Sequence, residues 1–251
     1  MDQLPVIIPE LDAQIALLAA AHRRANGPVM RLVNRMGGNI EGQLAMLPAA
    51  LRDQINRAVE TALTASYGVA KAGGRAPNLG PQGSTAIAVL TGAAGGFGGF
   101  AGSIAELPVT ITILLHAIRR EAQRAGYDPD SPAIRAACLQ VFAAGSPLSG
   151  DDGLNTAFLS ARLTLTGPAI QKVIATVAPR LAAAMGQKLV AQAVPLLGAV
   201  SGAVLNAAYV SYYREVARIR FALIRLAEVH GAETVLTAFA MATTPPKITQ
   251  A

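Results

Sequence analysis

Apolar residues recur at intervals of three and four along most of the chain, which is the spacing of one buried face of an α-helix. Residues 48–74 give the clearest example, with this apolar set: Leu51, Ile55, Ala58, Val59, Ala62 and Leu63. Charged residues such as Arg52, Asp53 and Glu60 fall between them, on the side expected to face water. No segment alternates apolar and polar residues as a half-buried strand does. The pattern predicts an all-α, multi-helical fold, which we expect to form a single domain over residues 1–251.

Glycine and proline mark where the central helices are expected to begin and end. One helix is predicted from Glu106 to about Ala125, with Gly126 as its C-terminal cap and a turn at residues 127–129. The clearest loop is GGRAPNLGPQGST, residues 73–85, because it combines several glycines and prolines with small polar residues.

A second helix is predicted to begin after a Ser131 cap, with Pro132 as its first residue, and to run to Ala144. The chain is again helical in pattern over residues 154–239. Breaks in that pattern are expected at these helix-breaking residues: Gly167, Pro168, Pro179, Gly186, Pro195 and Gly231.

Two stretches, residues 76–105 and 189–213, carry no charged side chain, and each exceeds the roughly 20 residues of a membrane-spanning helix. Prolines and paired glycines interrupt the first stretch, and the second contains Gln192 and Asn206, so a true span is the weaker interpretation. We expect instead two Gly/Ala-rich apolar helical hairpins at the centre of the fold, either buried or inserted into a bilayer conditionally.

The run GAAGGFGGFAGS, residues 92–103, raises the alternative of a phosphate-binding loop. That alternative fails because no Lys-Ser or Lys-Thr pair follows the glycines and no strand precedes them. Glycines four residues apart, as at Gly92 and Gly96 or Gly198 and Gly202, let one helix backbone approach another closely. Phe97 and Phe100 would then lie at the tip of the first hairpin, either filling the core or entering a bilayer.

Charge and composition narrow the class of protein. The net charge of +6 resides in residues 154–251, which hold nine Lys and Arg against three Asp and Glu. This basic third suits an anionic membrane surface, whereas aromatic residues are only 4% of the chain and offer few stacking platforms for nucleic acid. Acidic residues near the N-terminus and a single cysteine, Cys138, favour a cytoplasmic protein.

Four features follow one another in order over about residues 45–235. They are the glycine hairpin ahead of Leu107-Pro108, the Gly126-Tyr127-Asp128 turn, the Pro195/Gly198/Gly202/Asn206 series, and the basic-apolar helix through Arg218 and Phe221. Together they resemble the EcsC family of bacterial proteins. The resemblance implies an all-helical protein that faces the cytosol and associates with membranes or lipid, and it implies no catalytic residue.

The helix predicted from Glu106 places polar residues on one stripe. Thr112, His116, Arg119 and Gln123 follow helical spacing, so a buried stripe would suit an anionic headgroup and an exposed one would be solvated or meet a partner helix. No cofactor and no metal site are expected, because the three histidines lie far apart and Cys138 has no neighbouring ligand.

Lys188, Gln192 and Asn206 lie in or beside the second uncharged stretch, where an unpaired polar atom would cost about 1–3 kcal/mol. Their partners are expected to be the Glu106 carboxylate or helix ends, which would be structural, or the carboxylate or phosphate of a ligand. Thr110, on the same helix as Glu106, completes the candidate ligand-binding set.

The helix YYREVARIRFALIRLAEVHG places Arg214, Arg218 and Arg225 on one side and apolar residues on the other. Basic amphipathic helices suit a membrane surface, although the outer face of a helical bundle reads the same way. The leading hypothesis is a non-enzymatic, membrane-associated or lipid-binding protein at the inner face of the membrane, accessory to transport or envelope processes, with a membrane protein as a further candidate partner. The alternative is a hydrolase-type enzyme that acts on an apolar or acyl substrate, with His116 as acid/base and Glu106 orienting it.

Overall fold

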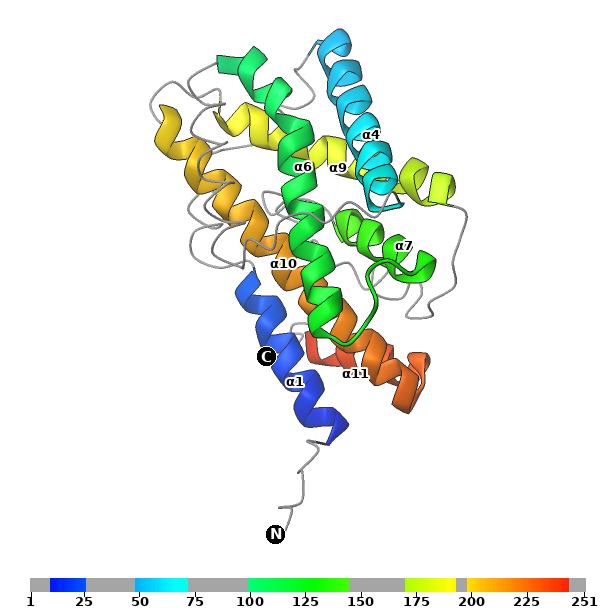
Figure 1. Cartoon of the computed structure of the whole chain (residues 1–251). Coiled ribbons are helices and arrows are strands. Elements are labelled where there is room, and N and C mark those ends of the chain that lie inside the picture. The colour runs from blue at the N-terminus through cyan, green and yellow to red at the C-terminus, as the bar shows by residue number, and fades with distance from the viewer. Residues whose placement is uncertain (1–9, 26–47, 72–98, 145–169, 193–197, 244–251) are drawn as a thin grey trace, which may run out of the picture.

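The computed structural model describes residues 10–25, 48–71, 99–144, 170–192 and 198–243 of the chain (Figure 1). Those residues form helices and short connections without any strand, so the predicted all-α, multi-helical fold is confirmed. The helices are α1 (Leu11–Ala25), α4 (Ala49–Lys71), α6 (Gly99–Arg124), α7 (Pro132–Gln140), the 3-10 helix η1 (Val141–Ala144), α9 (Ile170–Gln192), α10 (Gly198–His230) and α11 (Ala232–Thr243).

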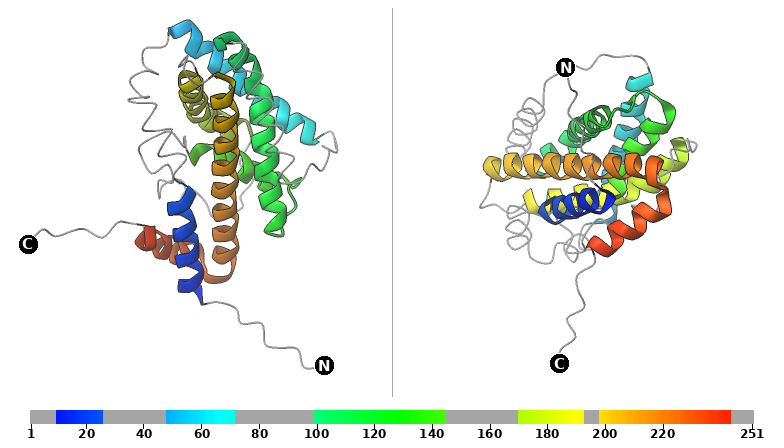
Figure 2. Two further views of the ribbon diagram at one scale, coloured as in Figure 1. Left: turned by 90° about the vertical axis from the view of Figure 1, so that its left-hand side faces the viewer. Right: turned by 90° about the horizontal axis from the view of Figure 1, so that it is seen from below.

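Helices α6 and α10 lie side by side at the centre and run in the same direction. Glu106 near the start of α6 contacts Asn206 near the start of α10, and the Tyr127 ring just beyond α6 packs on Phe221 further along α10. Helix α9 runs the opposite way, while α4 packs on α6 and α9. Helices α1 and α11 lie against the C-terminal half of α10 (Figure 2).

Helix α10 has the two sides that its sequence predicts. Val216, Ile219 and Leu223 are fully buried in the core, whereas Arg218 and Arg225 are exposed. Burying one such branched apolar side chain contributes about 1.5–3 kcal/mol, so this side holds α10 in place.

Helix α4 also presents its predicted face to the core. Ile55, Val59 and Leu63 are buried, and Arg52 and Glu60 are exposed. The periodicity of three and four therefore identifies the packing side of both helices.

The turn after α6 forms where glycine was expected. Gly126 has a φ of 90°, and its N–H donates to the Gln123 carbonyl at 2.9 Å while the Tyr127 N–H donates to the Ala122 carbonyl at 3.0 Å. These two bonds form a Schellman motif, which satisfies carbonyls that the helix end leaves open. Gly231, with a φ of 84°, likewise follows the end of α10.

Ser131 precedes α7 with an extended backbone, and Pro132 is the first helical residue, as predicted. The Ser131 side chain does not cap the helix, however, because its hydroxyl donates to the Asp128 carbonyl at 3.0 Å. The residues up to Ala144 are helical, but the last turn, η1, is 3-10.

Three predictions about helix boundaries are wrong. Helix α6 begins at Gly99 rather than Glu106 and continues through Pro108, and α9 continues through Pro179 and Gly186 without a break. Both prolines are exposed, so water can bond the carbonyls that they leave open. Gly186 is buried inside α9, where packing outweighs its weak helix propensity.

The second uncharged stretch contributes to the core where it is described. Leu189, Leu205, Tyr209 and Val210 are all buried, and no helix in the described ranges has the length and apolar content needed to cross a membrane. The two hairpins remain a prediction, because the turns between their helices lie outside the described residues.

Replacing Gly126 by alanine is expected to lower the free energy of unfolding by about 1–2 kcal/mol, because the new Cβ meets no neighbour but the left-handed backbone disfavours it. Gly126→Asn should cost less, since asparagine tolerates this conformation. Chemical denaturation measures both changes, and an alanine variant as stable as the wild type would contradict the assigned turn.

Candidate functional site

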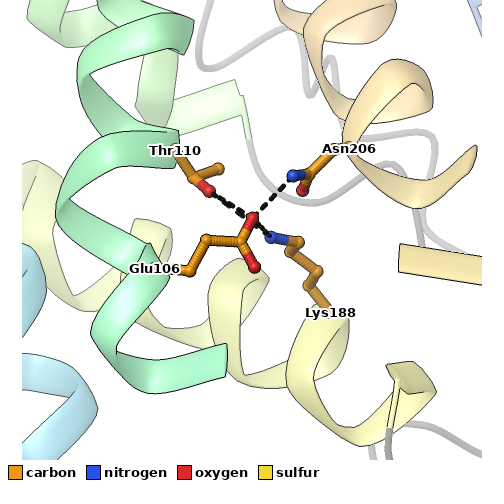
Figure 3. Close-up of polar contacts among 4 residues, drawn as sticks. All are labelled: Glu106, Thr110, Lys188 and Asn206. Carbon is orange, nitrogen blue, oxygen red and sulfur yellow. Dashed lines mark hydrogen bonds and ion pairs between the residues drawn. The ribbon is translucent and has the colours of Figure 1, made fainter. Parts of the chain in front are cut away.

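Four polar side chains meet inside the protein where α6, α9 and α10 converge (Figure 3). Glu106 and Thr110 come from α6, Lys188 from α9 and Asn206 from α10. All four are buried, and Lys188 has an exposed fraction of 0%. We refer to these four residues as the polar cluster.

Local sequence places each member of the polar cluster on an inward side of its helix. Glu106 and Thr110 are four residues apart, so both point the same way from α6. Glu106 is the first charged residue after the uncharged stretch 76–105, and Lys188 is the last one before the uncharged stretch 189–213. The charges that bound the two uncharged stretches therefore pair with each other.

The two carboxylate oxygens of Glu106 differ in their contacts. Oε1 accepts hydrogen bonds from Asn206 Nδ2 at 2.6 Å, Thr110 Oγ1 at 3.1 Å and Lys188 Nζ at 3.4 Å. Lys188 Nζ also donates to Thr110 Oγ1 at 3.5 Å. Oε2 is buried and has no hydrogen-bond partner in the part of the chain that the structure describes. One acceptor of the polar cluster thus remains open.

Electrostatics make the two charges of the polar cluster depend on each other. Burial lowers the pKa of Lys188, and the Glu106 carboxylate opposes this effect by favouring the charged ammonium. Leaving either charge buried alone would cost several kcal/mol.

The polar cluster accounts for two of the polar residues in or beside the second uncharged stretch. Glu106 bonds to both Lys188 and Asn206, which is the structural alternative raised by the sequence. Gln192 is the last residue of α9, and the structure describes its backbone but not its side chain. Phe100 lies in the first turn of α6, where the structure describes its backbone but not its side chain. Phe97 lies outside the described residues.

The remaining candidate residues of α6 lie apart from the polar cluster. Thr112 is exposed and donates to the Pro108 carbonyl at 2.8 Å, while Arg119 forms an ion pair with Asp130 at 2.7 Å. His116 is half-buried. Burial is the main reason why its pKa is lowered, and the positive charges of Arg120 and Arg119 lower the pKa further. The predicted ligand-binding set therefore divides into an inner and an outer group.

Glu106 and His116 do not form the pair that the enzymatic alternative requires. Ten residues along one α-helix correspond to about 15 Å, which is far beyond hydrogen-bond reach. Both residues belong to the continuous helix α6, and Glu106 bonds instead to the other members of the polar cluster.

The arginine side of α10 carries acidic residues as well. Arg218 forms a bidentate pair with Glu215, at 2.9 and 2.7 Å. Burial raises the pKa of Glu121 on α6, and the nearby charges of Arg124, Arg214 and Arg218 oppose this effect. Attraction between Glu121 and the two α10 residues Arg214 and Arg218 helps to hold α6 against α10.

The described residues contain no group of three or more histidine, cysteine or acidic side chains that could hold a metal ion. Cys138 is buried in α7, and burial raises the pKa of its thiol to about 12. A thiol with such a pKa remains protonated near neutral pH and is a poor nucleophile.

Sequence reasoning missed Arg220. This side chain is 1% exposed and donates to Gln140 Oε1 of α7 at 2.6 Å, and burial lowers its pKa to about 10. The sequence contains one sign that Arg220 is buried, because this residue lies between Ile219 and Phe221 on the apolar side of α10.

Comparison with known proteins gives one match. A model of the EcsC protein family matches residues 81–226, more than half of the chain, and this region includes the whole polar cluster. No curated protein and no solved structure matches the chain.

Replacing Lys188 by methionine is expected to lower the free energy of unfolding by about 3–5 kcal/mol, because the Glu106 carboxylate then stays buried without its counter-charge. Adding Glu106→Gln should recover part of that loss, since the double variant buries no charge. Denaturant titration of the wild type, both single variants and the double variant measures the coupling. Strictly additive losses would contradict the pairing.

His116 gives the protein a pH dependence of defined sign. Its pKa is lowered in the folded state, so the unfolded chain binds more protons below the ordinary value of 6.5 and stability falls as the pH drops through that window. His116→Gln lacks this contribution. The difference in unfolding free energy between the two proteins should change between neutral pH and about pH 5. A constant difference would contradict the lowered pKa.

Proposed function

The chain belongs to the EcsC protein family, and we propose that it is a non-enzymatic, membrane-associated protein that binds lipid or another apolar ligand. The observation that carries this proposal is the ion pair between Glu106 and Lys188. It joins the charged boundaries of the two uncharged stretches at one level of the helical bundle.

Beyond that level, α6, α9 and α10 continue with uncharged residues only: 99–105, 189–192 and 198–205. The corresponding ends of the three helices lie at the same end of the molecule (Figures 1 and 2). We call these three ranges the uncharged end. Charged side chains are the most costly groups to place among acyl chains, so helix ends without them are the best suited to that environment.

The arginine side of α10 supports an orientation toward anionic lipid. Arg214, Arg218 and Arg225 lie on the outer side of this helix, away from the apolar core. Basic residues near an anionic leaflet contribute about 1 kcal/mol each, and here Glu215 offsets part of the attraction.

The proposed location is the cytoplasm, with peripheral binding at the inner face of the membrane. The cytoplasmic leaflet is negatively charged, which matches the basic C-terminal third of the chain. In this setting the protein would serve transport or envelope processes, with lipid as its main partner and a membrane protein as a second one.

Flotation with vesicles tests the proposal. The wild-type protein is expected to float with vesicles that contain phosphatidylglycerol, and less with vesicles of phosphatidylcholine alone. Replacing the three outer arginines of α10 by glutamine should weaken binding to the anionic vesicles about tenfold or more, and raising the salt concentration should act in the same direction.

A matched control removes the same charge elsewhere. Arg57 on α4 and Lys172 and Arg180 on α9 are all exposed. Their joint replacement by glutamine should leave flotation close to that of the wild type. Equal losses of binding in the two triple variants would mean that net charge alone, and not the arginine side of α10, determines flotation. A wild-type protein that floats with neither kind of vesicle would contradict membrane association.

A further inference from the structure

The open acceptor of the polar cluster leads to a specific ligand class. Resting on the function proposed above, we propose that Glu106 Oε2 receives a hydrogen bond from an uncharged hydroxyl group of the bound ligand. The ligand is then a long-chain alcohol or an acylglycerol with a free hydroxyl, and its alkyl chain lies along the uncharged end.

The contacts of Glu106 define what the ligand must supply. An ionised carboxylate only accepts hydrogen bonds, and three donors already converge on Oε1. Oε2 is buried with no donor within reach in the described part of the chain, and Glu106 as a whole is 7% exposed. A buried acceptor of this kind costs free energy until a donor reaches it. The missing group is therefore a donor.

A second buried side chain of α9 also has an open acceptor. Gln187, which precedes Lys188 in α9, is 5% exposed, and its Oε1 is buried without a partner in the described residues. The open groups of Glu106 and Gln187 are both acceptors. For Glu106, a ligand headgroup that donates a hydrogen bond suits the open acceptor, and one that only accepts does not.

The charges of the polar cluster decide which kind of ligand headgroup fits Glu106 Oε2. The polar cluster contains one carboxylate and one ammonium, and two neutral groups complete it. A hydroxyl leaves this balance unchanged. An ionised fatty acid or phosphate would face Oε2 with like charge, and an alkylamine would add a second cation beside Lys188 in a region shielded from water.

The position of Glu106 fits an amphiphile. Toward the start of α6 the next seven residues, 99–105, are uncharged and span about 10 Å along the helix axis. A headgroup at Oε2 would therefore leave its alkyl chain beside uncharged helix ends.

Calorimetric titration of the full chain with three decyl compounds tests the inference. Decanol is expected to bind at least about tenfold more tightly than decanoate or decylamine, measured at a pH where both are charged. Decanoate or decylamine binding as tightly as decanol would overturn the assigned class. If none of the three binds, the proposed lipid-binding function fails with it, whereas preference for a charged compound leaves that function intact.

A double variant tests the role of Oε2 while leaving no buried charge unpaired. In Glu106→Gln with Lys188→Met, the amide oxygen accepts from Asn206 and Thr110, so the NH2 group takes the place of Oε2 and donates. This protein should bind decanol at least about tenfold more weakly and bind methyl decanoate, an acceptor, more tightly than the wild type does.

The control variant is Tyr209→Phe, which removes a different buried hydrogen bond between α9 and α10, from Tyr209 Oη to the Ala184 carbonyl at 2.8 Å. It should keep the preference for decanol. Circular dichroism and the unfolding midpoint establish that each variant is folded. Unchanged decanol affinity in a folded double variant would overturn the assignment of Oε2.

Discussion

Removing a carboxylate and an ammonium from water costs several kcal/mol for each ion, and in this chain that cost falls on Glu106 and Lys188. Their mutual attraction, with the hydrogen bonds from Thr110 and Asn206, offsets the cost only while α6, α9 and α10 meet at one point. The ion pair therefore fixes the relative position of three helices. It also fixes where the charged part of the bundle ends and the uncharged end begins.

In the same three helices, the distribution of charge also differs between the inner and the outer side of the bundle. Inside, the two charges of the polar cluster compensate each other, and the buried Arg220 of α10 donates to Gln140 of α7 within a mostly apolar core. On the outer side of α10 lie Arg214, Arg218 and Arg225, where Arg218 pairs with Glu215 and the charges of Arg214 and Arg218 act on Glu121 of α6. A protein built this way has a basic outer side and an uncharged end, and these two features suit an anionic surface and an apolar ligand respectively.

Sequence periodicity predicted the sides of α4 and α10 and the turn at Gly126, because these depend on neighbours within a few residues. It failed where the rest of the fold determines whether a helix continues. At Pro179, for example, α9 continues because the proline lies on its exposed side. The partners of Glu106 lie 82 and 100 residues away, so the sequence could propose the pairing but not its geometry. The open state of Oε2 depends on that geometry and could not be predicted at all.

The central claim is that the uncharged end holds an apolar ligand whose headgroup reaches the polar cluster. Native mass spectrometry of the purified full chain, followed by extraction and analysis of what it carries, tests this most directly. The account predicts a mass excess that organic extraction removes and that consists of a long-chain molecule with a free hydroxyl. A chain that has only its own mass, both as purified and after incubation with such a molecule, would contradict it.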